Sequence, residues 1–255
     1  MMETTEAGIY IFCGVQLEEE KDFGSITVEE TDRNIFTIHF KDAAMVAAEV
    51  PMKIYKPSKE NLMMHQNVIT KVMNTCDTVI PISFGNVFKT KEDVAVLLEN
   101  LYPQSSELFP KIKGKIEVGL KVIGKKDWLE EQVQQKPEIG AIASTVHSKS
   151  EAAGYYDRIK LGEAAQKMIT SLQQNIQTDI YQPLEAYAEA AVLNDPIGER
   201  MLLNASFLID KEREAEFDEQ VNIAHDQWQD KVDFQYTGPW PAYNFINIRL
   251  TVEET

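Results

Sequence analysis

The segment Gly238-Pro239-Trp240-Pro241 constrains this chain more than any other stretch of its sequence. Each proline fixes its own φ angle and pushes the residue before it into extended geometry. Residues 243–250 then alternate with period two and present one apolar face, which predicts a final β-strand. None of these side chains is nucleophilic or acid–base active. The bracket, residues 238–245, therefore favours binding or architecture over catalysis.

The first part of the chain alternates strand and helix patterns. Strands are predicted at 8–15, 34–40 and, interrupted by Pro81 and hence at a sheet edge, 78–83, while 44–50 is either a strand or a short helix. Two helices are also predicted. Ser58 caps one that runs to about Cys76, and Thr90 with Asp93 forms a capping box that opens the other.

Pro103 and Pro110 bracket the end of that second helix and predict a domain boundary. A chain of 255 residues is long enough for two domains. We therefore expect an N-terminal α+β domain at 1–110 and a C-terminal domain at 111–255.

The second part reads as a strand, several helices, a strand, a helix and a last strand. The predicted elements are a strand at 115–123, helices at 126–135, 150–178 and 183–191, a strand at 201–209 and a helix capped by Asp210. This order predicts an open sheet with helices on one face. An α+β, ferredoxin-like arrangement with an enlarged helical first crossover fits it best.

The charge of the chain excludes several classes of partner. The net charge of −16, shared by both parts, repels a nucleic-acid backbone or an anionic membrane. The N-terminus lacks the pattern of a signal peptide, and no stretch approaches the roughly 18 apolar residues of a membrane span. Two cysteines, Cys13 and Cys76, do not suggest a disulfide framework. We expect a soluble, reduced protein of the cytoplasm.

No segment carries a recognisable catalytic or metal-binding motif. Gly119 to Lys126 is the nearest approach to a phosphate loop, but its intervening residues alternate as a strand does and Lys126 stands where a P-loop needs Ser or Thr. The four histidines, His39, His65, His147 and His225, lack ligand spacing. We expect no enzyme activity, no cofactor and no metal site.

Two apolar motifs remain, Ile80 to Phe88 and the bracket. Aromatic residues beside Gly and Pro commonly plug the end of a sheet, which is the ordinary structural interpretation. The alternative is a partner-binding surface, because aromatic residues dominate interface hot spots. The candidate partner-binding residues are Pro81, Phe84, Gly85, Phe88, Pro239, Trp240, Pro241, Tyr243 and Phe245.

These motifs resemble those of a known family, the gas vesicle proteins F and L (GvpF/GvpL). The bracket looks like that family's C-terminal signature, and residues 80–88 resemble its proline, phenylalanine-glycine, valine-phenylalanine element. Residues 10–14, 114–122 and 202–209 are similar to three of its strands, in the family's order. The resemblance covers almost the whole chain and looks closest to F-type members of bacillus-like gas vesicle clusters.

A few positions depart from the family pattern. Ser83 stands where a basic residue is expected and Ala242 where a third proline is common. Asn86 and Asn244 occupy positions that are often Thr or Ser. The resemblance therefore implies no role for Ser83 or Ala242.

The resemblance implies a gas vesicle accessory protein located in the cytoplasm and at the gas vesicle. It would bind the hydrophobic shell subunit, of GvpA/GvpB type, and other accessory proteins, and assist nucleation or assembly of the wall. An alternative is a minor structural component of the shell without a chaperone-like role. A weaker alternative is a ferredoxin-like small-molecule enzyme, which would need histidines or carboxylates converging in a pocket.

Overall fold

The structure is a computed structural model that describes residues 6–148 and 154–248. It is a mixed helix-and-sheet protein, as predicted. Contacts within the chain divide it into two compact units. The first unit combines the residues up to Glu117 with those from Pro239 onward, and the second comprises Val118–Gly238. The bracket thus straddles the division, with Gly238 in the second unit and the rest in the first.

The first unit is built on a six-stranded sheet in the order β2-β3-β4-β1-β5, in which β6 also pairs with β1. Its strands are β1 (Ala7–Gln16), β2 (Ser25–Val28), β3 (Thr31–Phe40), β4 (Ala43–Pro51), β5 (Val79–Pro81) and β6 (Val87–Phe88). All residues of β1 except the two at its ends are buried, because β1 is central and covered on both faces. The strands expected at 8–15 and 34–40 are confirmed, and residues 44–50 form a strand.

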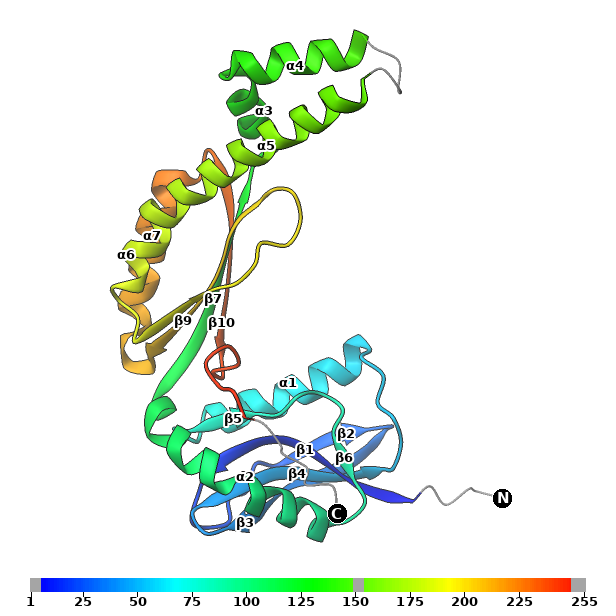
Figure 1. The fold of residues 1–255 in the computed structure, drawn as a ribbon. Helices are drawn as coiled ribbons and strands as arrows, with labels where there is room; N and C mark the ends of the chain where they lie inside the picture. Colours follow the sequence, from blue (N-terminus) through cyan, green and yellow to red (C-terminus); the bar gives the residue numbers. More distant parts are fainter. Residues whose placement is uncertain (1–5, 149–153, 249–255) are drawn as a thin grey trace. The chain divides into compact units, whose positions relative to one another are not determined.

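Two helices cover opposite faces of this sheet, α1 (Lys59–Met73) and α2 (Lys91–Ile112) (Figure 1). Helix α1 buries Val68, Ile69 and Val72 against the aromatic side chains of β1. The predicted caps are present: Ser58 accepts a hydrogen bond from the Asn61 backbone, and Thr90 and Asp93 form a reciprocal capping box.

The end of helix α2 was predicted between Pro103 and Pro110, but the helix continues past Pro110 to Ile112. Its buried stripe keeps helical spacing through both prolines, at Leu101, Ser105 and Phe109. Burial of that stripe outweighs the hydrogen bonds that the prolines remove. The expected domain boundary at 110/111 accordingly falls inside this helix.

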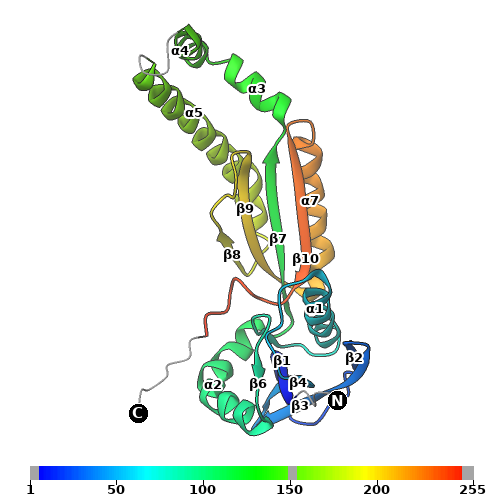
Figure 2. The ribbon, with the colours of Figure 1, turned by 90° about the vertical axis from the view of Figure 1, so that its right-hand side faces the viewer.

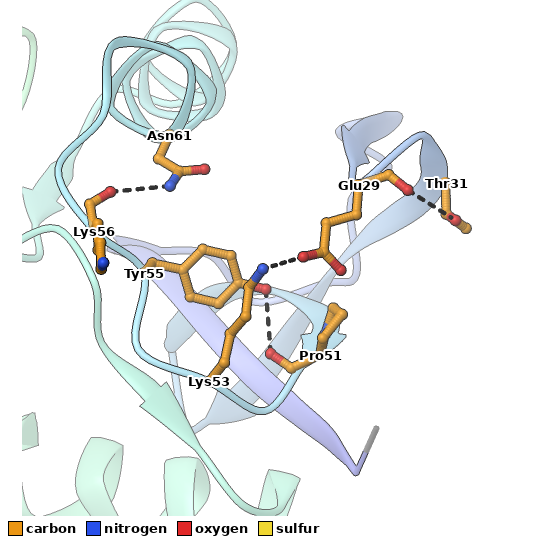
Figure 3. A network of polar contacts seen from close by, with 7 residues as sticks. All are labelled: Glu29, Thr31, Pro51, Lys53, Tyr55, Lys56 and Asn61. Carbon is orange, nitrogen blue, oxygen red and sulfur yellow. Dashed lines mark hydrogen bonds and ion pairs between the residues drawn. The ribbon is translucent and has the colours of Figure 1, made fainter. Parts of the chain in front are cut away.

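The connection from β4 to α1 is tied to the β2–β3 turn by polar contacts (Figure 3). The Lys53 ammonium pairs with the Glu29 carboxylate and lies 5.1 Å from the centre of the Tyr55 ring. The Tyr55 hydroxyl donates to the Pro51 carbonyl at 3.2 Å. This network holds the segment that leads into α1 close to the sheet.

The second unit contains a four-stranded sheet in the order β10-β7-β9-β8. Its strands are β7 (Lys115–Gly124), β8 (Ala190–Leu193), β9 (Met201–Asp210) and β10 (Val232–Trp240). The helical segments are α3 (Lys126–Gln134), α4 (Pro137–Ser148), α5 (Tyr155–Ile176), the π-helical η1 (Gln177–Tyr181), α6 (Gln182–Glu185), the 3-10 turn η2 (Lys211–Arg213) and α7 (Glu214–Trp228). Helices α5 and α7 lie on one face of the sheet (Figures 1 and 2).

The core of this unit forms between that sheet face and the helices. Phe207 on β9 is fully buried, with its ring centre 5.6 Å from Tyr181 and 5.2 Å from Phe217. The strands at 115–123 and 201–209 and the helix at 126–135 are confirmed. The expected single helix at 150–178 is shorter and is preceded by a separate helix, α4; residues 150–153 lie outside the described part.

Two predictions in this region were wrong. The helix expected at 183–191 ends at Glu185, and Ala190–Leu193 instead form β8, which pairs antiparallel with β9. The final strand expected after Pro241 is also absent, because β10 ends at Trp240 and Tyr243–Ile248 join no helix or strand. Arg249 and Leu250 lie outside the described residues. Pro239 is tolerated in β10 because that strand lies at the sheet edge.

Candidate functional site

The first apolar motif, residues 80–88, lies along the central strand β1. Ile80 of β5 pairs with Gly14 of β1, and Phe88 of β6 pairs with Ile9 of β1. The loop between β5 and β6 closes on β1 through two backbone hydrogen bonds, from Ile82 to the Phe12 carbonyl and from Ile11 to the Asn86 carbonyl, each 3.1 Å long. The motif is thus an ordered edge of the first sheet.

A buried network beneath this loop fixes its shape. The Gly85 backbone N–H donates to the Tyr10 hydroxyl at 2.9 Å, and that hydroxyl lies 3.0 Å from His65 Nδ1. His65 Nε2 lies 3.1 Å from the Ile82 carbonyl, which can only accept. His65 therefore carries its proton on Nε2, and Tyr10 donates to Nδ1. The Phe84 ring packs on both, at 6.3 Å from Tyr10 and 5.7 Å from His65.

The backbone conformation of this loop favours glycine at position 85. Gly85 has a φ of +91°, a conformation that side chains with a Cβ rarely adopt. This geometry turns the chain so that the Gly85 N–H faces the Tyr10 hydroxyl. Gly85 and Phe84, both predicted as partner-binding residues, thus belong to a packed turn.

Burial sets the protonation of this network. It lowers the pKa of His65 and raises the pKa of Tyr10 to about 12, because the charged form of each side chain would lose its hydration. Both groups are therefore neutral at pH 7, as the hydrogen-bond assignment requires.

We expect the stability of the protein to fall as the pH drops below about 6.5, the ordinary pKa of histidine. Because the pKa of His65 is lowered in the folded chain, this histidine binds a proton in the unfolded chain at pH values where it stays neutral in the folded chain. The free energy of unfolding should decrease by up to about 1.4 kcal/mol per pH unit from this group. Urea unfolding between pH 7.5 and 5.5 measures the slope. His65→Gln should flatten it, and an equal slope in both proteins would contradict this assignment.

The second motif, the bracket, turns sharply after β10. Pro241 and Ala242 are buried, and the Tyr243 and Phe245 backbones donate to the Pro241 and Ala242 carbonyls. Tyr243 is half-exposed, and partial burial raises its pKa to about 12.

A buried glutamate anchors this turn. Glu117 on β7 is 4% exposed, and its two carboxylate oxygens accept from the Asn244 backbone N–H at 2.8 Å and the Asn244 side-chain amide at 2.5 Å. A buried carboxylate needs such donors to remain charged at acceptable cost. Glu117 thus holds the C-terminal segment on the first unit.

The two motifs meet at an apolar groove, which we call the α2 groove. It has a volume of about 360 Å³ and lies between α2, one face of the first sheet and the C-terminal segment. Its walls include Ile11, Met45, Ile80, Leu97, Leu101 and Phe109. No charged side chain lines it among the described residues.

The structure places the nine predicted partner-binding residues in four different surroundings. Pro81, Phe88 and Tyr243 line the α2 groove. Phe84 and Gly85 belong to the Tyr10–His65 network, and Pro239 and Trp240 end β10. Pro241 is buried and Phe245 half-buried in the turn.

Sequence reasoning missed the residues that hold both motifs in place, Tyr10, His65 and Glu117. A lone histidine on a helix gives no signal of its partners. The one available signal was Glu117, an acid between Ile116 and Val118 in an apolar strand.

The described residues hold no cluster of three or more His, Cys, Asp or Glu side chains suited to a metal ion. Within the same residues, no helix is long and apolar enough to cross a membrane. Gly119 to Gly124 form the end of β7, followed by α3 from Lys126, as the strand interpretation predicted. Cys13 and Cys76 are free thiols.

Comparison with known proteins agrees with these features. Residues 8–247 match the model of the gas vesicle synthesis protein GvpL/GvpF family. Gas vesicle protein F of Dolichospermum flosaquae is 27% identical over 204 residues, which cover 79% of this chain and 82% of that protein. Gas vesicle protein F1 of Halobacterium salinarum is 23% identical over 222 residues, covering 86% and 84%.

Solved structures show the same fold. The crystal structure of GvpF from Anabaena sp. superposes with a TM-score of 0.81 at 22% identity, covering 96% of this chain and 100% of that one. GvpF from Microcystis aeruginosa gives 0.74 at 20% identity, covering 93% and 98%. The family match spans nearly the whole chain, so the chain belongs to the gas vesicle synthesis protein GvpL/GvpF family.

Proposed function

We propose that this chain is a gas vesicle accessory protein that binds the hydrophobic shell subunit and assists nucleation or assembly of the vesicle wall. The observation that carries the proposal is the α2 groove, a largely apolar site with no charged side chain among its described lining residues, on a protein with a net charge of −16. A wall subunit with an apolar face would aggregate alone. An acidic partner with a limited apolar site could keep such a subunit soluble until it is added to the wall.

The proposal places the protein in the cytoplasm and at the growing vesicle, with other accessory proteins as further partners and no catalytic step. The strand order of the second unit supports the ferredoxin-like domain that we include in this proposal. Its strand order β10-β7-β9-β8, with helical segments in the β7–β8 and β9–β10 connections, agrees with a ferredoxin-like domain whose first crossover is enlarged by α3, α4 and α5.

We expect Leu97→Asn to weaken binding of the shell subunit about tenfold, because it puts an amide into the apolar wall of the groove. Val96→Asn is the matched control, since Val96 is the neighbouring residue on α2 but is 58% exposed. Binding is measured by titrating labelled shell subunit with each purified protein, after circular dichroism has shown that the variants fold.

Two outcomes would count against the proposal. Failure of the wild-type protein to bind the shell subunit would remove it. Stoichiometric, detergent-resistant association with purified vesicles, without any cytosolic complex with the free subunit, would instead favour a minor structural component of the wall.

A further inference from the structure

The C-terminal segment, residues 243–248, is seated at the α2 groove without being part of the sheet. Tyr243, Ile246 and Ile248 line the groove, and the segment lies on the α2 side of the first sheet (Figure 2). Residues 246–248 join no helix or strand. Ladder hydrogen bonds of the kind that fix a strand in a sheet are therefore not what holds them.

The segment alternates in its contact with the groove. Ile246 and Ile248 are half-buried, whereas Asn247 between them is exposed. Residues 246–248 thus place aliphatic side chains on the groove at alternate positions, which is the pattern of an extended segment.

The segment does not fill the groove. A volume of about 360 Å³ stays open between its two isoleucines and the other walls. The wall opposite them is aliphatic, from Met45, Leu97 and Leu101 among others. A segment with larger or more numerous aliphatic side chains would bury more of this wall.

Asn244 secures the segment by donating two hydrogen bonds to the buried Glu117 carboxylate. Tyr243, Ile246 and Ile248 add partial apolar contacts with the groove. Leaving the groove therefore costs the segment this anchor and these apolar contacts.

We propose that residues 243–248 occupy, in the free protein, the binding site of an extended partner segment with aliphatic side chains at alternate positions, and that this partner segment displaces them. The proposal rests on the proposed function for the identity of the partner, the shell subunit. The C-terminal segment then acts as an internal competitor, which keeps part of the apolar wall covered until the partner arrives.

The test uses the full-length chain and a fluorescent peptide that repeats residues 239–248, followed by two lysines for solubility. Asn244→Ala weakens the internal competitor, so it should bind the peptide about tenfold more tightly than the wild type. Asn247→Ala makes the same chemical change at the exposed position of the same segment, and should bind as the wild type does. Fluorescence anisotropy measures both.

Two further changes keep the test independent of folding defects. Ile248→Asn loosens the segment without touching the Glu117 anchor and should also tighten peptide binding. A peptide with both isoleucines replaced by asparagine should lose binding to every protein. Equal affinity of wild type, Asn244→Ala and Ile248→Asn for the peptide, or unchanged binding of the substituted peptide, would overturn the proposal.

Shell-subunit binding by the same proteins separates this proposal from the proposed function. Tighter binding of the subunit to Asn244→Ala than to the wild type supports both. Equal binding to the two proteins would leave the proposed function standing and overturn displacement. If the peptide binds as expected but the shell subunit binds to none of the proteins, the segment is displaceable and the shell subunit is not its partner.

Discussion

Tyr10→Phe is expected to lower the free energy of unfolding by about 3 kcal/mol, although it removes a single oxygen atom. That oxygen accepts from the Gly85 backbone and donates to His65, and the Tyr10 ring is fully buried. Phenylalanine would leave a nitrogen of the buried His65 ring and the half-buried Gly85 N–H without their partner, at about 1–3 kcal/mol each. For a chain of this size the midpoint of thermal unfolding should fall by about 10 °C.

The matched control for this substitution is Tyr55→Phe. The Tyr55 ring is nearly buried and packs edge-on against Tyr10 at 5.4 Å, but its hydroxyl makes one hydrogen bond, to the half-buried Pro51 carbonyl. Its loss should cost less than about 1 kcal/mol. Differential scanning calorimetry of the two variants checks the difference. Equal losses would mean that the loop at 82–86 does not depend on Tyr10.

The sequence predicted those parts of the fold that local patterns determine. Helix α1 with Ser58 at its start and the capping box at Thr90 follow from residues close together in the chain. The strand β8 did not, because Ala190 and Ala191 suit a helix equally well and only pairing with β9 selects a strand. The end of helix α2 was predicted too early for a related reason, because burial of its apolar stripe in the tertiary structure outweighs the effect of two prolines.

The sequence identified the two segments that border the candidate site, but not the residues that hold these segments in place. Their composition singled out the two apolar motifs, and the structure shows that both border one groove, through Pro81, Phe88 and Tyr243. Tyr10 and His65 are 55 residues apart, and Glu117 and Asn244 are 127 apart. Such pairs are created by the tertiary fold alone, so no local spacing announces them.

The prediction of a last strand after Pro241 failed for a physical reason that matters for function. Residues 243–248 have the alternation of a strand, yet in this structure the alternation serves the wall of a groove. An alternating pattern states which side chains face an apolar surface; it does not state whether the backbone pairs. The segment is thus strand-like in sequence and held at Asn244.

Glu117→Ala is expected to release this segment, with a larger effect on its local stability than on the stability of the whole chain. Hydrogen bonds to a charged group contribute about 1.5–3 kcal/mol each, and Glu117 accepts two from Asn244. A loss of about 3 kcal/mol would raise the opening equilibrium of residues 241–248 about 100-fold. Hydrogen exchange of the Asn244 and Phe245 backbone amides should accelerate accordingly, because exchange reports such local opening.

Glu107→Ala is the matched control, because it removes an exposed carboxylate from α2. It should leave exchange of the same amides unchanged. In Glu117→Ala the amides of β1 should keep their protection, since the first sheet and its α1 face do not depend on the anchor. Acceleration throughout β1 would show that Glu117 stabilises the whole unit rather than the segment. Unchanged exchange at Asn244 and Phe245 would show that the two isoleucines hold the segment without it, and that a partner would have to displace those apolar contacts instead.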